Sequence, residues 1–180
     1  VDDGSTDGSA EVAEKIDHRV KLIRQNNQGV SVARNNGLAY ADGQYVMFAD
    51  ADDCFDPNWA EYVLPVLQKS ADLFLFNYYN GRKKVSIIDH STDLIGMDFA
   101  NYRLKMLENP TKYLTAWGKV LRMEVITSHQ LTFNSQLRLA EDGDFMVRYL
   151  IYCQNIVLND HYLYYYLDNE NSVMRSFDPN

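Results

Sequence analysis

Alternation of apolar strand patterns with helical patterns limits the folds open to this chain more than any other feature of its sequence. Residues 45–49 and 73–76 are unbroken apolar runs, which are typical of strands covered on both faces. Residues 7–17, 30–40 and 57–69 are typical of helices that bury one face. We therefore predict an α/β fold, with a mainly parallel sheet flanked by helices. The 180 residues suit a single domain.

The sequence begins where a strand would normally end. Val1 is followed at once by residues 2–5, Asp-Asp-Gly-Ser, a turn cluster that usually closes a strand. A buried strand should show about four to eight apolar residues before such a turn, and only one is present. We therefore expect the first strand of the predicted sheet to be missing from this sequence.

Charge and cysteine content exclude several classes of protein. The formal net charge of −8 at pH 7 disfavours sequence-independent nucleic-acid binding and a polybasic membrane surface. No apolar run approaches the ~20 residues that a membrane-spanning helix needs. Cys54 and Cys153 lie far apart in sequence, which is typical of reduced thiols in a cytosolic protein and not of a disulfide framework.

Carboxylates gather at the ends of two predicted strands. Asp2 and Asp3 form one cluster, and Asp50, Asp52 and Asp53 form the other. In an open α/β sheet, ligands bind in the crevice beyond the carboxyl ends of the strands. Three carboxylates within four residues repel one another unless a cation compensates, and Mg²⁺ or Mn²⁺ is the natural compensator for oxygen ligands. The alternative is a solvated acidic turn that caps the following helix.

Six parts of the sequence carry a family resemblance. In chain order they read V-D-D-G-S-T-D-G-S (1–9), N-N-Q-G-V-S-V-A-R-N-N-G-L (26–38), Y-V-M-F-A-D-A-D-D-C-F-D-P (45–57), T-A-W-G-K-V-L-R (115–122), L-A-E-D-G-D-F (139–145), and Y-L-Y-Y-Y-L (162–167) with N-S-V-M-R (171–175). The first three resemble the family 2 glycosyltransferases of the Rossmann-like GT-A fold. The last three resemble the bacterial members that build capsule, exopolysaccharide and wall polymers.

The resemblance implies an inverting, metal-dependent glycosyltransferase. Such an enzyme moves a sugar from a nucleotide-sugar donor, here a UDP-sugar, to a hydroxyl of a glycan or lipid-linked saccharide. It implies Mn²⁺ or Mg²⁺ as the cofactor and a cytoplasmic location at the inner face of the bacterial cell membrane. Within one domain, residues 1–180, we expect residues 1–90 to bind the nucleotide sugar and residues 91–180 to provide the acceptor side and the catalytic base.

The resemblance also assigns residues to the donor. Asp2 or Asp3 would hold the base or ribose of the nucleotide. Asn27 and Arg34 would border the nucleotide, with Arg34 near the base or the phosphates. From the residue pattern alone, Arg34 reads equally well as a surface arginine on a helix.

Metal and diphosphate ligands are implied in the same way. Asp50 and Asp52 correspond to the D-x-D motif, in which Asp52 is the more direct metal ligand and Asp50 reaches either the ribose or the metal. His161 would join the metal or the diphosphate, as a late histidine does in some GT-A enzymes; its alternative is a polar residue that begins a strand. Arg175 would contact the diphosphate from a C-terminal loop.

The catalytic candidates are Asp142 and its neighbour Glu141. Asp142 matches the position that supplies the base in inverting members, which takes a proton from the acceptor hydroxyl as that hydroxyl attacks C1 of the sugar. The structural alternative is an acid-rich first helical turn, which is common. Trp117 and Lys119 lie in the segment that lines the donor-sugar or acceptor side in similar proteins, and a Trp117 buried in the core is the alternative.

Three rival functions can be compared with this interpretation. A nucleotidyltransferase that forms nucleotide sugars uses the same ligands, although Glu141-Asp142 and the tyrosine-rich residues 162–167 fit it poorly. A non-catalytic nucleotide-sugar-binding fragment is the second rival. A response-regulator receiver domain should show a strand ending in Ser or Thr, whereas residues 73–76 are followed by Asn77, which argues against it.

Overall fold

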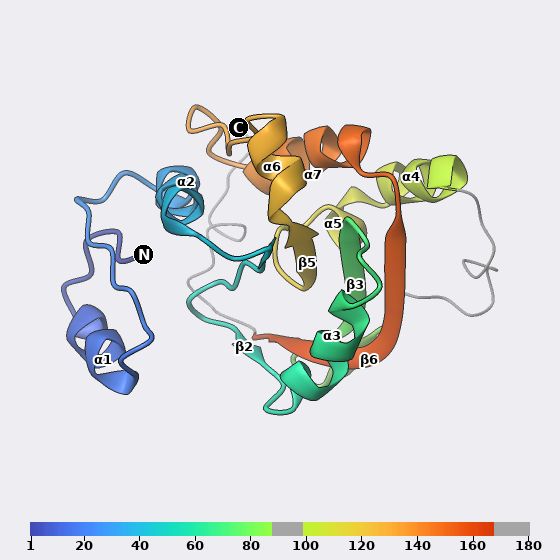
Figure 1. Ribbon diagram of the computed structural model, residues 1–180. Coiled ribbons are helices and arrows are strands. Elements are labelled where there is room, and N and C mark those ends of the chain that lie inside the picture. The colour runs from blue at the N-terminus through green and yellow to red at the C-terminus, as the bar shows by residue number, and fades with distance from the viewer. Residues whose placement is uncertain (88–98, 168–180) are drawn as a thin grey trace, which may run out of the picture.

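The structure, a computed structural model, describes residues 1–87 and 99–167 (Figure 1). Its elements are α1 (Ser9–Ile16), α2 (Val30–Tyr40), β1 (Tyr45–Val46), β2 (Cys54–Phe55), α3 (Trp59–Leu67), β3 (Leu73–Asn80), β4 (Lys83–Val85), α4 (Phe99–Glu108), α5 (Pro110–Tyr113), β5 (Lys119–Arg122), α6 (Met123–Ser128), α7 (Glu141–Tyr152) and β6 (Ile156–Tyr166). Helices and strands are mixed along the chain, which confirms the α/β class. None of the helices in these two ranges is long and apolar enough to cross a membrane.

One mixed sheet forms the centre of the molecule. Its strands lie in the order β1-β5-β3-β6-β2, and β4 pairs with β3. β3 and β6 run parallel, whereas the other strand pairs in the described ranges are antiparallel. The expectation of a mainly parallel sheet is therefore corrected to a mixed one. The β3–β4 hairpin shows one reason, because Asn80 pairs with Lys83 across a turn too short for a parallel crossover.

β6 is a long, bent strand that connects two parts of the sheet. Eight of its 11 residues pair with β3, and register shifts interrupt the pairing on both sides of Asn77. Irregularities of this kind bend a strand and increase its twist. The end of β6 also pairs with β2, through Tyr165 and Cys54, so the bend brings this end toward the acidic turn that precedes β2.

Residues 47–53, which contain the D-x-D, connect the two ends of the strand order. β1 and β2 stand at opposite ends of the order β1-β5-β3-β6-β2, although only this segment separates them in sequence. The acidic turn therefore lies on a connection that passes from one side of the sheet to the other.

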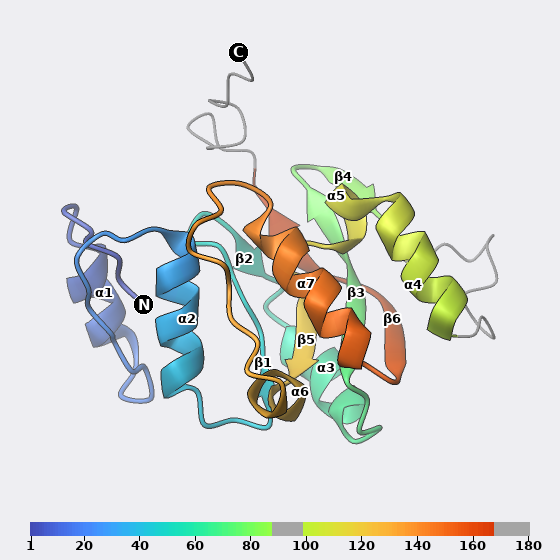
Figure 2. The ribbon, with the colours of Figure 1, turned by 90° about the horizontal axis from the view of Figure 1, so that it is seen from above.

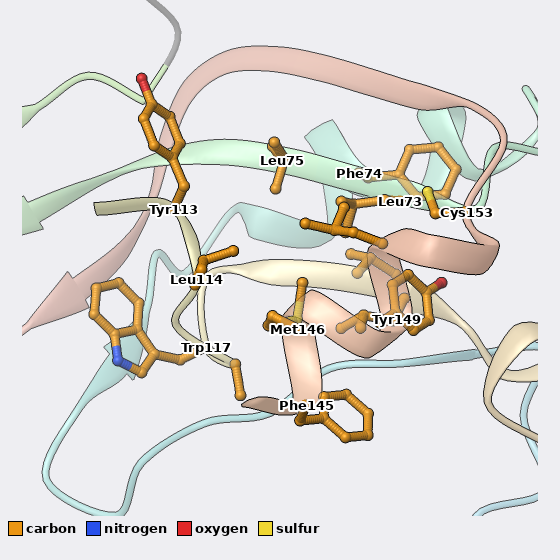
Figure 3. Close-up of a cluster of buried hydrophobic side chains, with 14 of the residues drawn as sticks. Leu73, Phe74, Leu75, Tyr113, Leu114, Trp117, Phe145, Met146, Tyr149 and Cys153 are labelled. Carbon is orange, nitrogen blue, oxygen red and sulfur yellow. The ribbon is translucent and has the colours of Figure 1, made fainter. Parts of the chain in front are cut away.

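α7 packs its apolar side against the sheet and supplies much of the core. Figure 3 shows Met146 and Tyr149 projecting from α7 toward β5, with Phe145 at the start of the same helix. All three side chains are fully buried. The hydroxyl of Tyr149 donates to the carbonyl of Asp72 at 2.5 Å and accepts the N–H of Arg122 at 2.9 Å, which fixes the helix to the start of β3 and the end of β5.

α1 and α2 lie beside the sheet, on the same side of the molecule in Figures 1 and 2. α2 is attached through Asn35, whose side chain exchanges hydrogen bonds of 2.8 and 2.7 Å with the backbone of Phe133. α1 is less well covered, because Val12 and Ile16 on its apolar side are 63% and 72% exposed. α2 faces the start of α7, and the contacts between them are described below.

Candidate functional site

A buried arginine joins three carboxylates from two distant parts of the sequence. Arg34, on α2, donates from Nη2 to Asp50 Oδ1 at 2.7 Å. Its Nη1 donates to Glu141 Oε1 at 3.1 Å and also to Asp142 Oδ1. The Arg34 side chain is only 11% exposed, so these charge-assisted bonds form largely out of contact with bulk water. The structure thus brings together four of the residues predicted for the site, and we call them the Arg34 cluster.

Burial and charge act against each other in the Arg34 cluster. Burial raises the pKa of Asp50 and the pKa of Asp142, and the charge of Arg34 opposes this rise without cancelling it. Burial alone would lower the pKa of Arg34, but the neighbouring carboxylates outweigh it and raise that pKa. With every group ionised, three carboxylates face one guanidinium, so two negative charges are in excess. Such a site favours the approach of additional positive charge.

The first turn of α7 places the two catalytic candidates. Glu141 and Asp142 begin the helix, where carboxylates interact favourably with the helix dipole. Ala140, the residue before them, has the left-handed φ of 60° that turns the chain into the helix. Asp142 Oδ2 accepts the backbone N–H of Ala116 at 2.9 Å, while Oδ1 accepts from Arg34. Both carboxylate oxygens of Asp142 are therefore oriented by donors from other parts of the fold.

A tyrosine hydroxyl holds the acidic turn in place. The backbone N–H of Asp53 donates to the carbonyl of Asp50 at 3.1 Å, which closes the turn. The Tyr164 hydroxyl accepts the N–H of Asp50 at 3.2 Å and donates to Asp53 Oδ2 at 2.7 Å, while the N–H of Leu167 donates to Asp53 Oδ1 at 2.9 Å. Asp53 therefore shapes the turn, Asp50 faces Arg34, and Asp52 is exposed.

The residues of this turn fit a hard divalent cation. Asp50 and Asp52 offer carboxylate oxygens two positions apart, next to a cluster with excess negative charge. Within residues 1–87 and 99–167, no group of three or more His, Cys, Asp or Glu side chains could hold a metal by itself. Mg²⁺ and ions like it usually take one or two protein carboxylates and complete their shell with water and substrate phosphates.

His161 stands apart from this turn. Its ring stacks on that of Tyr62, with centroids 4.0 Å apart, and its Nδ1 lies 2.8 Å from Asn159 Oδ1. These contacts keep His161 at the bulge of β6 beside α3, whereas the acidic turn meets the other end of the strand at Tyr164. The structure therefore does not bring His161 to Asp50 or Asp52.

The first acidic cluster supports the loop that leads into α2. Asp3 Oδ1 and Oδ2 accept the backbone N–H groups of Gln28 and Gly29, each at 2.8 Å. Burial works to raise the pKa of Asp3, but these hydrogen bonds outweigh it and lower that pKa. Asp2 accepts a backbone N–H of its own turn at 3.0 Å, and Asn27 lies exposed on the supported loop. Asp3 thus helps to place both Asn27 and the helix that carries the central arginine.

Trp117 and Lys119 lie beneath the site and not on its surface. Trp117 is 8% exposed, and its ring stacks on Tyr164 and Tyr166 at centroid distances of 4.9 and 5.4 Å. Lys119 is completely buried, with Nζ donating to Thr115 Oγ1 at 2.8 Å and to the carbonyl of Trp117 at 3.2 Å. The core alternative for Trp117 agrees with this packing, and neither side chain is arranged to stack on a solvent-borne sugar.

Comparison with known proteins identifies the family. Residues 1–128 match the family model described as "Glycosyl transferase family 2". The chain belongs to this family. The residues matched include Arg34 and the D-x-D, whereas Glu141 and Asp142 lie beyond the end of the match.

Curated relatives match this family 2 chain along nearly its whole length. EpsH of Bacillus subtilis (strain 168) is 29% identical, over 98% of this chain and 54% of its own length. The glycosyltransferase GlyG of Streptococcus pneumoniae is 28% identical, over 98% of this chain and 62% of its own length. This chain therefore spans roughly half to three fifths of the length of these two relatives.

A solved structure supports the GT-A fold of this family 2 chain. Residues 1–349 of S. aureus TarS, crystallised in complex with UDP-GlcNAc, superpose with a TM-score of 0.79 at 22% identity. The match covers 98% of this chain and 51% of the TarS chain. At this identity the likeness concerns the fold, and it confirms the predicted GT-A architecture.

Two contributors to the site were not anticipated from the sequence of this family 2 chain. Tyr164 belongs to a tyrosine-rich segment that signals packing, but nothing in that pattern distinguishes the one hydroxyl that holds the acidic turn. Ala116 contributes only its backbone N–H, a group that nearly every residue has, so no side-chain signal could reveal it. Arg175, a candidate from the resemblance, lies outside the described residues.

Proposed function

We propose that this chain carries the donor site and the catalytic base of an inverting, metal-dependent glycosyltransferase. The donor is a UDP-sugar, and the acceptor is a hydroxyl of a glycan or lipid-linked saccharide at the cytoplasmic face of a bacterial membrane. One observation carries the proposal: Arg34 connects the D-x-D residue Asp50 with Glu141 and Asp142 in a single cluster. Family membership and the likeness to TarS, which was crystallised with UDP-GlcNAc and with UDP, support it.

Asp142 is proposed as the general base. Its oxygens are oriented by Arg34 and by the N–H of Ala116, and its raised pKa makes it a stronger proton acceptor than an exposed aspartate. It takes the proton of the acceptor hydroxyl as the oxygen attacks C1 of the donor sugar. Attack opposite the leaving diphosphate inverts the configuration at C1. Glu141 shares Arg34 with Asp142 and helps to hold the guanidinium between them.

The donor diphosphate is proposed to lie between the acidic turn and α2. Asp52, which is exposed, and Asp50 would hold Mn²⁺ or Mg²⁺. When bound, such an ion acts as a Lewis acid that takes up the negative charge developing on the leaving diphosphate. Arg34 is placed to pair with a phosphate oxygen, since a guanidinium suits both carboxylate and phosphate geometry. Asn27 and Asp2, near the start of the same region, are proposed to border the nucleoside.

The donor site is tested by calorimetric titration of this chain with UDP, in Mn²⁺ and then in EDTA. We expect binding that depends on the metal, and we expect Asp52→Asn to abolish that dependence. Asp42→Asn is the matched control, because Asp42 is an exposed aspartate whose ion pair with Lys21 lies elsewhere on the surface. UDP affinity that is the same with and without metal in the unmodified chain would refute the metal-dependent proposal.

The base is tested separately from the donor site. Asp142→Asn should leave UDP binding within a few-fold of the unmodified protein and lower sugar transfer by at least the ~10²-fold typical of a general base. Asp144→Asn is the control, since Asp144 lies in the same helical turn and pairs with Arg148 at 2.5 Å. Transfer by Asp142→Asn at the rate of the unmodified protein would return Glu141-Asp142 to a role in starting the helix.

A further inference from the structure

Lys119 is a buried lysine, and burial of its ammonium group is expected to destabilise the fold. Its side chain has no exposed surface, and its ammonium meets a hydroxyl and a carbonyl, those of Thr115 and Trp117. Nζ also lies 5.9 Å from the centroid of the Trp117 ring. Burial of a lysine without a directly paired carboxylate is unfavourable, and it lowers the pKa of Lys119 to about 7. An apolar residue at this place in β5 would avoid that cost.

The hydrogen bonds of Lys119 converge on one short segment, residues 115–117. Nζ holds both ends of this segment, by the Thr115 hydroxyl at 2.8 Å and the Trp117 carbonyl at 3.2 Å. The Thr115 hydroxyl also donates to the same Trp117 carbonyl at 3.2 Å, so the two ends are tied together. The residue between them is Ala116, which has no exposed surface and whose N–H points to Asp142 Oδ2.

We propose that Lys119 is a positioning residue for Asp142, holding residues 115–117 so that the N–H of Ala116 orients the carboxylate of the base. The inference rests on the proposed function, because it takes Asp142 as the base. The same segment also touches the strand that leads to the D-x-D, through a bridge between Phe48 and Trp117. Lys119 therefore supports a segment that contacts both Asp142 and the residues leading to Asp50.

Lys119 and Asp142 also interact through their charges. Burial is the main influence on the pKa of each group. The charge of Asp142 acts to raise the pKa of Lys119, and the charge of Lys119 acts to lower the pKa of Asp142. The other charged groups around Asp142 are Arg34 from α2, Glu141 from α7 and Asp50 from the acidic turn. On the sheet side, Lys119 is paired with the apolar Leu75 of β3.

The test follows the Ala116 amide by NMR in this chain, without any ligand. In the unmodified chain, the ¹H–¹⁵N signal of Ala116 should titrate with Asp142, because the two groups share a hydrogen bond. In Lys119→Met, we expect hydrogen exchange of the Ala116 amide to accelerate by at least tenfold and its titration midpoint to rise. Lys69→Met, which changes an exposed lysine, is the control and should alter neither value.

Thr115→Val is a second variant that keeps the charge of Lys119 but removes one end of its attachment. It should also accelerate exchange at Ala116, and it keeps the proposal testable if Lys119→Met does not fold. Asp142→Asn should lower the pKa of Lys119, measured by ¹³C labelling at Cε, by as much as Lys119→Met raises that of Asp142, because coupling between two sites is reciprocal. Unchanged exchange at Ala116 in a folded Lys119→Met or Thr115→Val protein overturns the proposal.

These readouts separate this inference from the proposed function. They need no donor, acceptor or metal, so a chain that binds no UDP can still confirm or refute the link from Lys119 to Asp142. If the link holds and the enzyme transfers sugar, Lys119→Met should lower kcat at least tenfold while KM for the donor changes less than threefold. If Lys119 were purely structural, Lys119→Met would lower the melting temperature and leave the pH profile of kcat unchanged. If Lys119 positions Asp142, Lys119→Met shifts that profile.

Discussion

At the scale of single residues, the site holds groups that cost stability. Asp142 is largely buried beside Glu141, and burial raises its pKa even though Arg34 opposes the rise. A carboxyl whose pKa is higher in the folded than in the unfolded protein destabilises the fold when it is ionised. The cost is present above the folded pKa and disappears as the pH falls below the unfolded value, about 3.9. Such a residue is explained by chemistry better than by folding.

Asp142→Asn should therefore make the protein more stable at pH 7. Asparagine keeps an oxygen for the N–H of Ala116 and removes the buried charge, while Arg34 retains two carboxylate partners. Each unit of raised pKa corresponds to about 1.4 kcal/mol, and the advantage should shrink toward pH 4. Urea denaturation at both pH values measures it. Asp144→Asn, which loses an ion pair, should show no gain; equal stability of Asp142→Asn and the unmodified protein at pH 7 would contradict the argument.

At the scale of elements, local pattern and long-range pairing differ in how far they can be predicted. The helix α2 is expected at residues 30–40 because apolar spacing is a local property, and the structure has it at Val30–Tyr40. Strand directions were not predictable in the same way, since they depend on which distant segments pair. The separation of His161 from the acidic turn was unpredictable for the same reason, because no short sequence pattern indicates the bend of β6.

Two glycines test how the elements around the site are built. Added Cβ atoms at Gly143 and Gly118 would meet nothing within 4 Å, so space does not distinguish them. Gly143 lies in the first turn of α7, where Gly143→Ala should stabilise the protein by about 0.5–1 kcal/mol. Gly118 has a φ of 69°, so Gly118→Ala should destabilise it by about 1–2 kcal/mol. Thermal and urea unfolding measure both, and shifts of the same sign would refute this explanation.

At the scale of the whole molecule, the candidate site is the place where α2, the acidic turn and the start of α7 meet. The acidic pattern singled out Asp50 and Asp52, which lie in a closed turn, and the resemblance singled out Asp142. Neither could show that Arg34 would hold Asp50 and Asp142 together, because side-chain pairing over 16 and 108 positions leaves no local signature. In the structure this pairing connects α2 to the start of α7.

Arg34→Met should destabilise that junction more than the loss of a surface ion pair would. Three partly buried carboxylates would lose their partner, and breaking a buried pair costs about 3–5 kcal/mol. Hydrogen exchange should accelerate most in residues 25–41 and 133–145, and acidification should reduce the difference. Arg24→Met, which removes a half-exposed pairing with Glu11, should cost at most about 1 kcal/mol. Equal effects of the two variants would refute the junction.

The path of residues 47–53 limits how far the acidic turn can move. Eight Cα steps separate Val46 from Cys54, a reach of at most about 28 Å. Four strand spacings separate β1 from β2 in the order of the sheet, about 19 Å if the sheet were flat. The closed turn from Asp50 to Asp53 uses up part of the difference. The D-x-D is thus carried on a short connection whose two ends are both fixed in the sheet, and lengthening that connection would loosen the carboxylates without altering any of them.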